Sequence, residues 1–218
     1  MNTFNTIVKF FVDCGPFLYP SLLMMALGLA IAIERFIFLN RARADNRKLW
    51  DQLLPMLQSG KFREVAGVAE RSESAIGKIV SNGLQRMRDP HRREDIDNAM
   101  EEGMMEIVPR LEKRTHYIAT FANTITLVGL LGTIIGLIKG FTAVAAVNPA
   151  EKAEMLSASI SIAMNNTAFA LTVAIPFLLI HAFLQARTSE IVDGLEAAKI
   201  SFLNATQRLK AESAAAAR

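Results

Sequence analysis

This sequence of 218 residues contains one cysteine and one tryptophan, and its positive and negative charges nearly balance. Cys14 is the single cysteine, which excludes an internal disulfide and a cysteine-based metal cluster. The net charge is only +3 and no long basic block occurs, so no feature predicts nucleic-acid binding. Hydrophobic residues make up 51% of the chain and the mean hydropathy is +0.27, which indicates a membrane protein.

Catalytic motifs are absent from the sequence as well. The three histidines, His91, His116 and His181, do not have metal-ligand spacing, and we interpret them as solvated or interfacial. Neither a phosphate-binding loop nor a nucleophile arrangement occurs. We therefore expect no enzymatic activity, no resident metal and no cofactor.

Three apolar runs are long enough to cross a bilayer, which needs about 20 apolar residues of helix. The segments between them show helical periodicity, so the sequence predicts an all-α membrane protein with three transmembrane helices and long helical extensions. We expect these segments: an N-terminal interfacial helix at 1–15, the first span at 16–39, a helical loop at 40–117, the second span at 118–147, a turn at 148–156, the third span at 157–184, and a C-terminal helix at 185–218.

The distribution of basic residues predicts the topology. The loop at 40–117 and the tail at 185–218 hold twenty Lys and Arg residues between them, whereas the N-terminal segment and the turn hold one each, Lys9 and Lys152. By the positive-inside rule, the N-terminus and the turn are periplasmic, and the loop and tail are cytoplasmic. Within the loop, a helical pattern continues from residue 90 into the second span without a clear stop, and we expect Pro109 to interrupt and kink it.

Glycines mark one face of the second span. Gly132, Gly136 and Gly140 are spaced four residues apart and therefore share a helix face, which we call the glycine ladder. Small residues let a second membrane helix approach closely, so we expect the ladder and Gly129 to pack against another helix.

Polar side chains gather at one depth of the second and third spans. Because the two spans run antiparallel, Thr133 and Thr167 lie within about 6 Å of the same depth. A threonine in a membrane helix often bonds only to its own backbone, and that interpretation stays open here. The other interpretation is an ion pathway that includes Thr133, Thr167, Asn165 and Asn166.

Acidic side chains occur at the membrane boundary of the first span and are absent from the second and third spans. Glu34 and Arg35, near the end of the first span, are interpreted as an ion pair at the membrane boundary. The second and third spans contain no Asp or Glu. Since an ion relay generally needs a titratable or anionic group inside the membrane, another chain has to supply that carboxylate if this chain conducts ions.

Two motifs carry a family resemblance. LVGLLGTIIGLIKGF at 127–141 and NTAFALTVAIP at 166–176 resemble the MotA/TolQ/ExbB proton-channel family, and the match is nearest to its three-span TolQ/ExbB branch. The GLLGT motif of that family is matched at 129–133, its third-span TA-x-G-L-x-x-A-I-P pattern from Thr167 to Pro176, and the end of its first span by IERFIFL at 33–39. The resemblance covers most of the chain.

The resemblance implies a homo-pentamer in the bacterial inner membrane around a dimer of a single-span ExbD/TolR-like protein. That partner would bring the missing aspartate, and Thr133 and Thr167 would face it and help to pass the ion. Proton flow would then drive mechanical work on the cell envelope, such as TonB-dependent transport, with a TonB-like protein as a further partner, or a Tol-type function.

Three positions depart from the family pattern. Ile162 stands where a glutamate commonly precedes the third-span threonine, Ala170 replaces a glycine, and Thr126 stands where a proline often precedes the GLLGT motif. The alternatives that remain are a sodium-coupled protein, a specialised paralogue that drives surface motility, and a non-conducting oligomeric membrane scaffold held by its glycine ladder.

Overall fold

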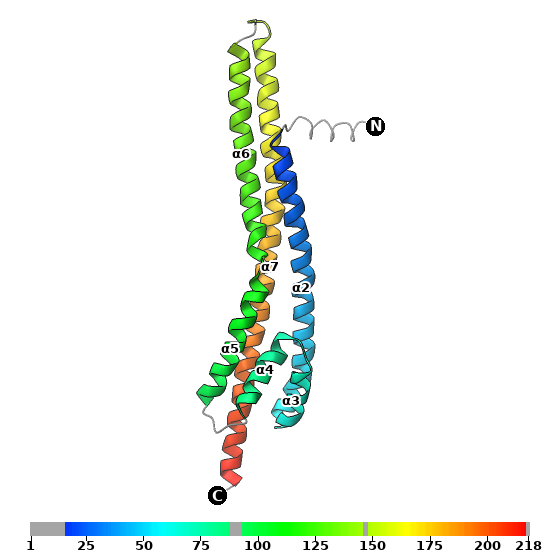
Figure 1. Cartoon of the computed structure of the whole chain (residues 1–218), viewed down its shortest axis with the longest axis vertical. Coiled ribbons are helices and arrows are strands. Elements are labelled where there is room, and N and C mark those ends of the chain that lie inside the picture. Colours follow the sequence, from blue (N-terminus) through cyan, green and yellow to red (C-terminus); the bar gives the residue numbers. More distant parts are fainter. Residues whose placement is uncertain (1–15, 88–92, 146–147, 217–218) are drawn as a thin grey trace, which may run out of the picture. The chain divides into compact units, whose positions relative to one another are not determined.

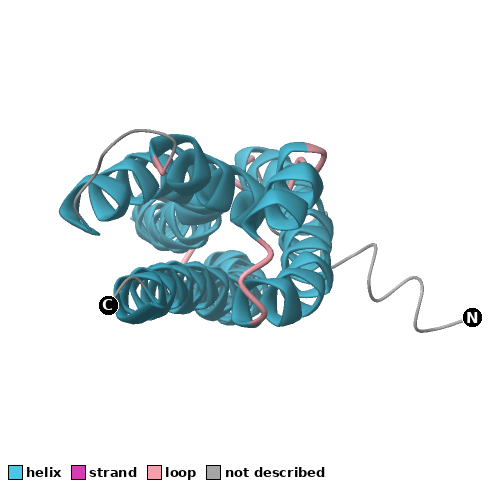
Figure 2. Cartoon of the chain, turned by 90° about the horizontal axis from the view of Figure 1, so that it is seen from below, coloured by secondary structure: helices cyan, strands magenta, loops and turns pink. Residues whose placement is uncertain are grey.

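The described part of the chain is built from α-helices. The computed structural model describes residues 16–87, 93–145 and 148–216, and these ranges contain helices and short loops but no strand (Figure 2). This confirms the all-α prediction. The expected interfacial helix at 1–15 and positions 146–147 of the second span lie outside the described residues. The helices, in chain order (Figure 1), are α2 (Leu18–Gln58), α3 (Phe62–Glu70), α4 (Ala75–Arg86), α5 (Arg93–Glu112), α6 (Thr115–Ala145) and α7 (Lys152–Ala216).

Three stretches of the described helices are long and apolar enough to cross a membrane, which confirms the predicted number of spans. They fall within Leu18–Gln58, Arg93–Ala145 and Lys152–Leu209, and their most apolar windows have mean hydropathies of 2.0 to 2.2. No more than 28% of any of these windows is buried within the chain. So much exposed apolar surface needs lipid or other membrane helices to cover it.

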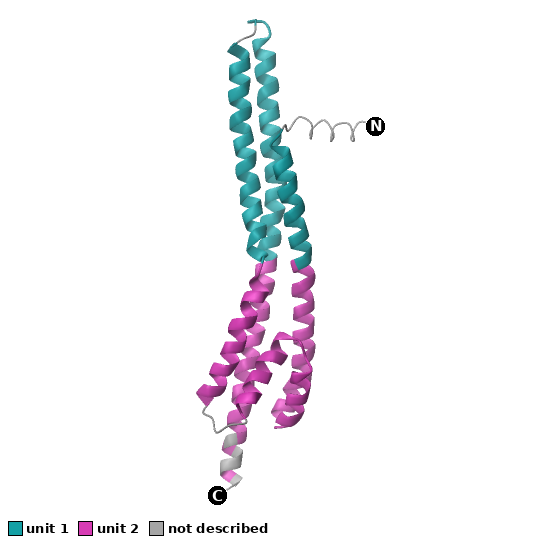
Figure 3. Ribbon diagram, viewed as in Figure 1, with its two compact units in different colours: residues 1–34, 114–183 teal, residues 35–113, 184–218 magenta. Residues whose placement is uncertain are grey.

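The chain divides into two compact units (Figure 3). Unit 1 comprises residues 1–34 and 114–183, and unit 2 comprises residues 35–113 and 184–218. The first part of α2, all of α6 and the first part of α7 therefore belong to unit 1. Unit 2 contains α3, α4, α5 and the remaining parts of α2 and α7.

A two-residue turn precedes α6, although the sequence predicted no stop before the second span and placed the interruption at Pro109, which lies inside α5. Helix α5 ends at Glu112 and α6 begins at Thr115. Arg114 adopts a left-handed backbone conformation with φ of 69°, which is costly for a residue with a side chain. Its guanidinium lies 3.4 Å from the Glu34 carboxylate on α2 and forms an exposed ion pair within unit 1.

Apolar periodicity explains the core of unit 2. Leu53 of α2, Val65 of α3 and Val80 of α4 are fully buried. Phe202 of α7 is also fully buried, and its ring meets that of Phe62 edge-on with the ring centroids 6.0 Å apart. Each of these residues belongs to the apolar face of its helix. Burial of these faces against one another packs the helices around a common core.

A mixed ion cluster links α7 to α5 in unit 2. Lys199 Nζ lies 3.2 Å from Asp97 Oδ1 and 2.5 Å from Glu101 Oε2. Hydrogen bonding to Glu101 raises the pKa of Lys199 above its ordinary value of 10.5, partial burial opposes this, and Asp97 adds to the increase. The folded state therefore binds the Lys199 proton more tightly than the unfolded state does.

This cluster predicts a loss of stability in alkali. Because the pKa of Lys199 is raised on folding, its contribution is complete below 10.5 and is lost as the pH rises through the higher folded value. We expect Lys199→Met to lower the unfolding temperature in detergent at about pH 8, with a smaller difference from wild type by about pH 11. Lys61→Met is the control, because its ion pair with Glu64 is exposed to solvent. A difference for Lys199→Met that stays constant with pH would contradict the assignment.

Candidate functional site

The glycine ladder of α6 packs against α7 of the same chain. A Cβ atom added at Gly136 would lie 3.1 Å from the Cβ of Ala163, and one added at Gly140 would lie 2.5 Å from the Cβ of Ser159. At Gly132 an added Cβ would collide with the side-chain amide of Asn166. The two backbones approach this closely only because α6 has no side chain at these positions.

Gly129 extends the same contact by one further turn. A Cβ added there would collide with the Cβ of Ala170, which is itself buried. Ala170 is the residue that stands where the family pattern has glycine. The contact therefore pairs a glycine on α6 with an alanine on α7, so one methyl group fills the space between the helices.

The two threonines predicted to share a depth are in direct contact. The hydroxyl oxygens of Thr133 on α6 and Thr167 on α7 form a hydrogen bond. The Thr133 hydroxyl also lies 3.0 Å from the carbonyl oxygen of Gly129 and 3.4 Å from that of Ala163, and the Thr167 hydroxyl lies 3.2 Å from the Gly129 carbonyl. Both side chains are half-buried, so this cluster is open on one side.

Asn166 completes the cluster from the buried side. Its side chain is 2% exposed, and its amide nitrogen donates to the Gly129 carbonyl oxygen at 3.2 Å. The Gly129 carbonyl thus has three side-chain donors within hydrogen-bonding distance, from Thr133, Thr167 and Asn166. The Asn166 Oδ1 atom is buried and has no hydrogen-bond partner among the described residues.

The remaining predicted residues lie apart from this cluster. Asn165 is half-buried and makes no side-chain hydrogen bond with another described residue. Glu34 pairs with Arg114, whereas Arg35 in unit 2 is 5% exposed and donates to the carbonyl oxygens of Arg110 and Leu111 at 3.4 and 3.5 Å. The predicted boundary pairing of Glu34 with Arg35 stays a prediction.

The cluster has the chemistry of a relay or a small cation site but lacks a titratable group. A hydroxyl donates one hydrogen bond and can accept two, and each threonine here has more than one acceptor within reach. The proton of either hydroxyl can therefore turn between acceptors. No Asp or Glu occurs in 118–147 or 157–184, so the cluster cannot hold a net negative charge by itself.

Sequence reasoning missed three contributors to unit 1. Ala163 and Ala170 contact the glycine face of α6. Two small residues seven positions apart share a helix face, and this spacing could have predicted the contact. Arg114 is the partner of Glu34, which its position 80 residues away in the sequence concealed. The burial of Asn166 against Gly132 also went unpredicted, because a polar side chain was expected to face the pathway.

Comparison with known proteins places these features in a family. The family model described as the MotA/TolQ/ExbB proton channel family matches residues 71–197, which include the ladder and the threonine cluster. A biopolymer transport protein ExbB homolog of Methanothermobacter thermautotrophicus is 22% identical over 201 residues, which cover 91% of this chain and 70% of that protein. An ExbB-like protein 3 of Synechocystis is 26% identical over 161 residues, or 73% of this chain and 76% of that protein.

The helix contact predicts opposite effects of alanine at two helical glycines. Gly132→Ala pushes a methyl group into the Asn166 amide, and we expect it to destabilise the detergent-solubilised protein by about 1–3 kcal/mol. Gly194→Ala in α7 meets nothing within 4 Å and is expected to stabilise by about 0.5–1 kcal/mol. Thermal unfolding followed by circular dichroism measures both changes.

A double substitution isolates the contact itself. Asn166→Ala removes the side chain that the new methyl group would strike, so the loss on Gly132→Ala should be smaller in the Asn166→Ala background. Equal losses in both backgrounds would show that Asn166 does not fill the space opposite Gly132.

Proposed function

The chain belongs to the MotA/TolQ/ExbB proton channel family, and from this premise we propose that it is the ion-conducting subunit of a membrane motor that uses proton flow to do mechanical work. The observation that carries the proposal is the contact between Thr133 and Thr167. Two hydroxyls with shared acceptors, half-exposed between two membrane helices, form a polar step in an otherwise apolar region. An ion path through lipid needs such a step.

The missing carboxylate supports a partner. Since neither the second nor the third span contains Asp or Glu, the proposed path is completed by an aspartate from a single-span protein of the ExbD/TolR type. We place a dimer of that protein inside a homo-pentamer of this chain. The exposed apolar surface of the three spans offers the area that lipid, neighbouring copies and the partner would cover.

The proposed orientation follows from charge. The basic residues of 40–117 and 185–218 favour the cytoplasmic side of a bacterial inner membrane, with the N-terminus and the turn at 148–156 in the periplasm. In this orientation the partner would transmit force to the envelope, as in TonB-dependent transport or a Tol-type process. The chain itself would act without an enzymatic reaction or a resident cofactor.

Sodium is the second candidate for the conducted ion. The Oδ1 of Asn166, which has no partner in the described part of the chain, is a buried acceptor on the side chain that bonds to the Gly129 carbonyl, as the Thr167 hydroxyl also does. Uncharged oxygens of this kind are ligands that hard cations accept. The scaffold alternative has less support, because the ladder proposed to join copies already packs against α7 of its own chain.

The proposal predicts that both hydroxyls are needed for ion flow. Thr133→Val and Thr167→Val keep the side-chain shape and remove the hydroxyl, and each should reduce the flow to the background level in cells that co-express the single-span partner. The readout is cytoplasmic acidification, measured with a pH-sensitive fluorescent protein. Thr126→Val and Thr172→Val are matched controls, because among the described residues those hydroxyls bond only to carbonyls of their own helix.

The outcomes separate the candidates. Acidification that persists in both Thr133→Val and Thr167→Val would overturn the pathway assignment. A leak that depends on external sodium and changes no cytoplasmic pH would retain the motor and make sodium the ion. If copurification shows the partner bound but no ion flows, the scaffold is favoured.

A further inference from the structure

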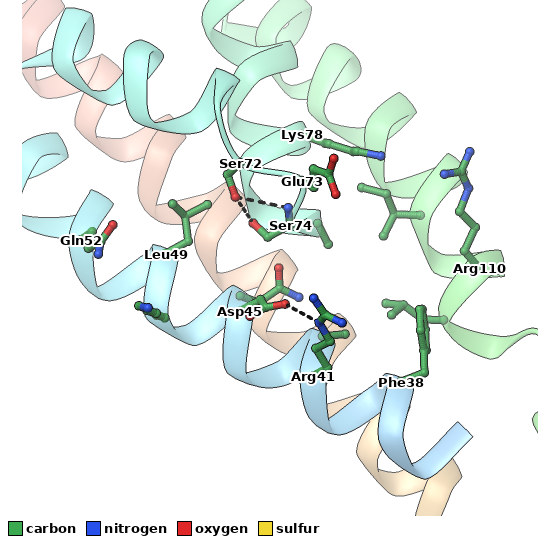
Figure 4. Close-up of a pocket in the computed structure, with 16 residues that line it drawn as sticks. Phe38, Arg41, Asp45, Leu49, Gln52, Ser72, Glu73, Ser74, Lys78 and Arg110 are labelled. Carbon is green, nitrogen blue, oxygen red and sulfur yellow. Dashed lines mark hydrogen bonds and ion pairs between the residues drawn. The ribbon is translucent and has the colours of Figure 1, made fainter. Parts of the chain in front are cut away.

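A cavity of about 700 Å³ lies within unit 2, whereas the threonine cluster belongs to unit 1. Its walls come from α2, the start of α4 with the loop before it, and the end of α5 (Figure 4). Phe38, Leu49, Ile107 and Leu111 supply apolar lining. The volume falls within the range of pockets that hold small organic ligands.

Positive charge dominates the polar lining. Arg41 and Lys48 come from α2, Lys78 from α4 and Arg110 from α5. Arginine supplies a planar fork of N–H donors that matches phosphate oxygens, and lysine supplies a mobile point charge. Arg110 is already paired with Glu106, whose carboxylate lies 2.6 Å away in an exposed ion pair.

The acidic residues nearby neutralise only part of this charge. Asp45 and Glu73 are the two carboxylates of the lining, and Asp45 lies 3.8 Å from Arg41 in an exposed pair. Within the ranges that the structure describes, Lys48 and Lys78 form no ion pair. Four cations in the lining against Asp45, Glu73 and Glu106, the partner of Arg110, leave a net charge of about +1.

Asn46 provides a separate indication of an anion. This lining residue is 6% exposed, and its Oδ1 accepts a hydrogen bond of 3.0 Å from the backbone N–H of Ile76. That bond fixes which side of the amide is oxygen and which is nitrogen. The Nδ2 atom is buried and has no partner among the described residues, so a hydrogen-bond acceptor is missing there.

The start of α4 adds to the positive potential. Ser74 caps this 12-residue helix by accepting a bond of 3.2 Å from the Gly77 N–H, and both Ser74 and Ala75 line the cavity. The positive end of the helix dipole therefore faces the same space as the cations and the Asn46 amide. All three features favour an anion.

We propose that this cavity binds a phosphate group that carries an organic substituent. The cations and the Asn46 Nδ2 would contact the phosphate oxygens, and the apolar lining would contact the substituent, since the volume exceeds what a bare phosphate fills. Such a group reaches the cavity either as the headgroup of an anionic lipid or as a soluble phosphate ester. The proposal does not depend on ion conduction by unit 1.

Titration of the full chain in phosphatidylcholine nanodiscs tests this proposal. Dihexanoyl phosphatidic acid is the lipid probe, and glycerol 3-phosphate presents the same headgroup without acyl chains. Binding is measured by isothermal titration calorimetry. We expect saturable binding of at least one probe and a weakening of about tenfold or more in Lys78→Gln/Arg110→Gln. Arg63→Gln/Arg208→Gln removes the same charge from exposed positions outside the lining and should bind as wild type does.

The two probes distinguish a lipid headgroup from a soluble phosphate ester as the ligand. Binding of both probes with similar affinity identifies a soluble phosphate ester, whereas binding of the lipid probe alone identifies a headgroup. Absence of binding by either probe would overturn the proposal, as would an equal loss in the two double variants. If Lys78→Gln/Arg110→Gln instead changes the oligomer size and no probe binds, the cations serve a neighbouring copy and the proposal fails.

Asn46→Asp separates binding from folding. A carboxylate at position 46 still accepts from the Ile76 N–H, and near the start of α4 it is favoured by the helix dipole. It replaces the donor that has no partner among the described residues with a largely buried negative charge, so thermal unfolding is measured beside binding. We expect a loss of phosphate binding of about tenfold or more in a protein that remains folded. Phosphate binding that survives Asn46→Asp would show that the amide does not contact the ligand.

Discussion

The close approach of α6 to α7 at the glycine ladder is the constraint on which unit 1 depends. Gly132, Gly136 and Gly140 each face a side chain of α7, and a Cβ added at any of them would crowd it. This approach is also what brings Thr133 and Thr167 within hydrogen-bonding distance. The same absence of side chains thus provides both the packing and the polar step, so a stability measurement and a conduction measurement report on one contact.

The membrane-spanning part of unit 1 contains polar groups whose hydrogen bonds the chain itself satisfies only in part. The Gly129 carbonyl has donors from two helices, yet the buried Oδ1 of Asn166 is without a partner in the described part of the chain. Unit 2 has the opposite character, since its Lys199 cluster and basic cavity are rich in charge. The two proposals accordingly concern separate parts of one chain, ion passage in unit 1 and phosphate binding in unit 2.

Much of this arrangement could be predicted from sequence, because it depends on local periodicity. Hydropathy is additive along a helix, so the three spans followed directly, and glycines four residues apart identified the packing face. The break at Arg114 could not be predicted, since nothing in the local pattern requires a left-handed arginine. The basic cavity was missed because its residues come from helices far apart in sequence, although Asn46 on the apolar face of Leu49 and Leu53 was a visible irregularity.

The most direct measurement is proton flux into liposomes that contain this chain alone or together with its single-span partner, with a pH-sensitive dye inside and an imposed potential. The central claim is that this chain supplies hydroxyls and another chain supplies the carboxylate. The account predicts no flux from the chain alone, flux from the two together, and none when the partner's intramembrane aspartate is replaced by asparagine. Flux from this chain alone would contradict it.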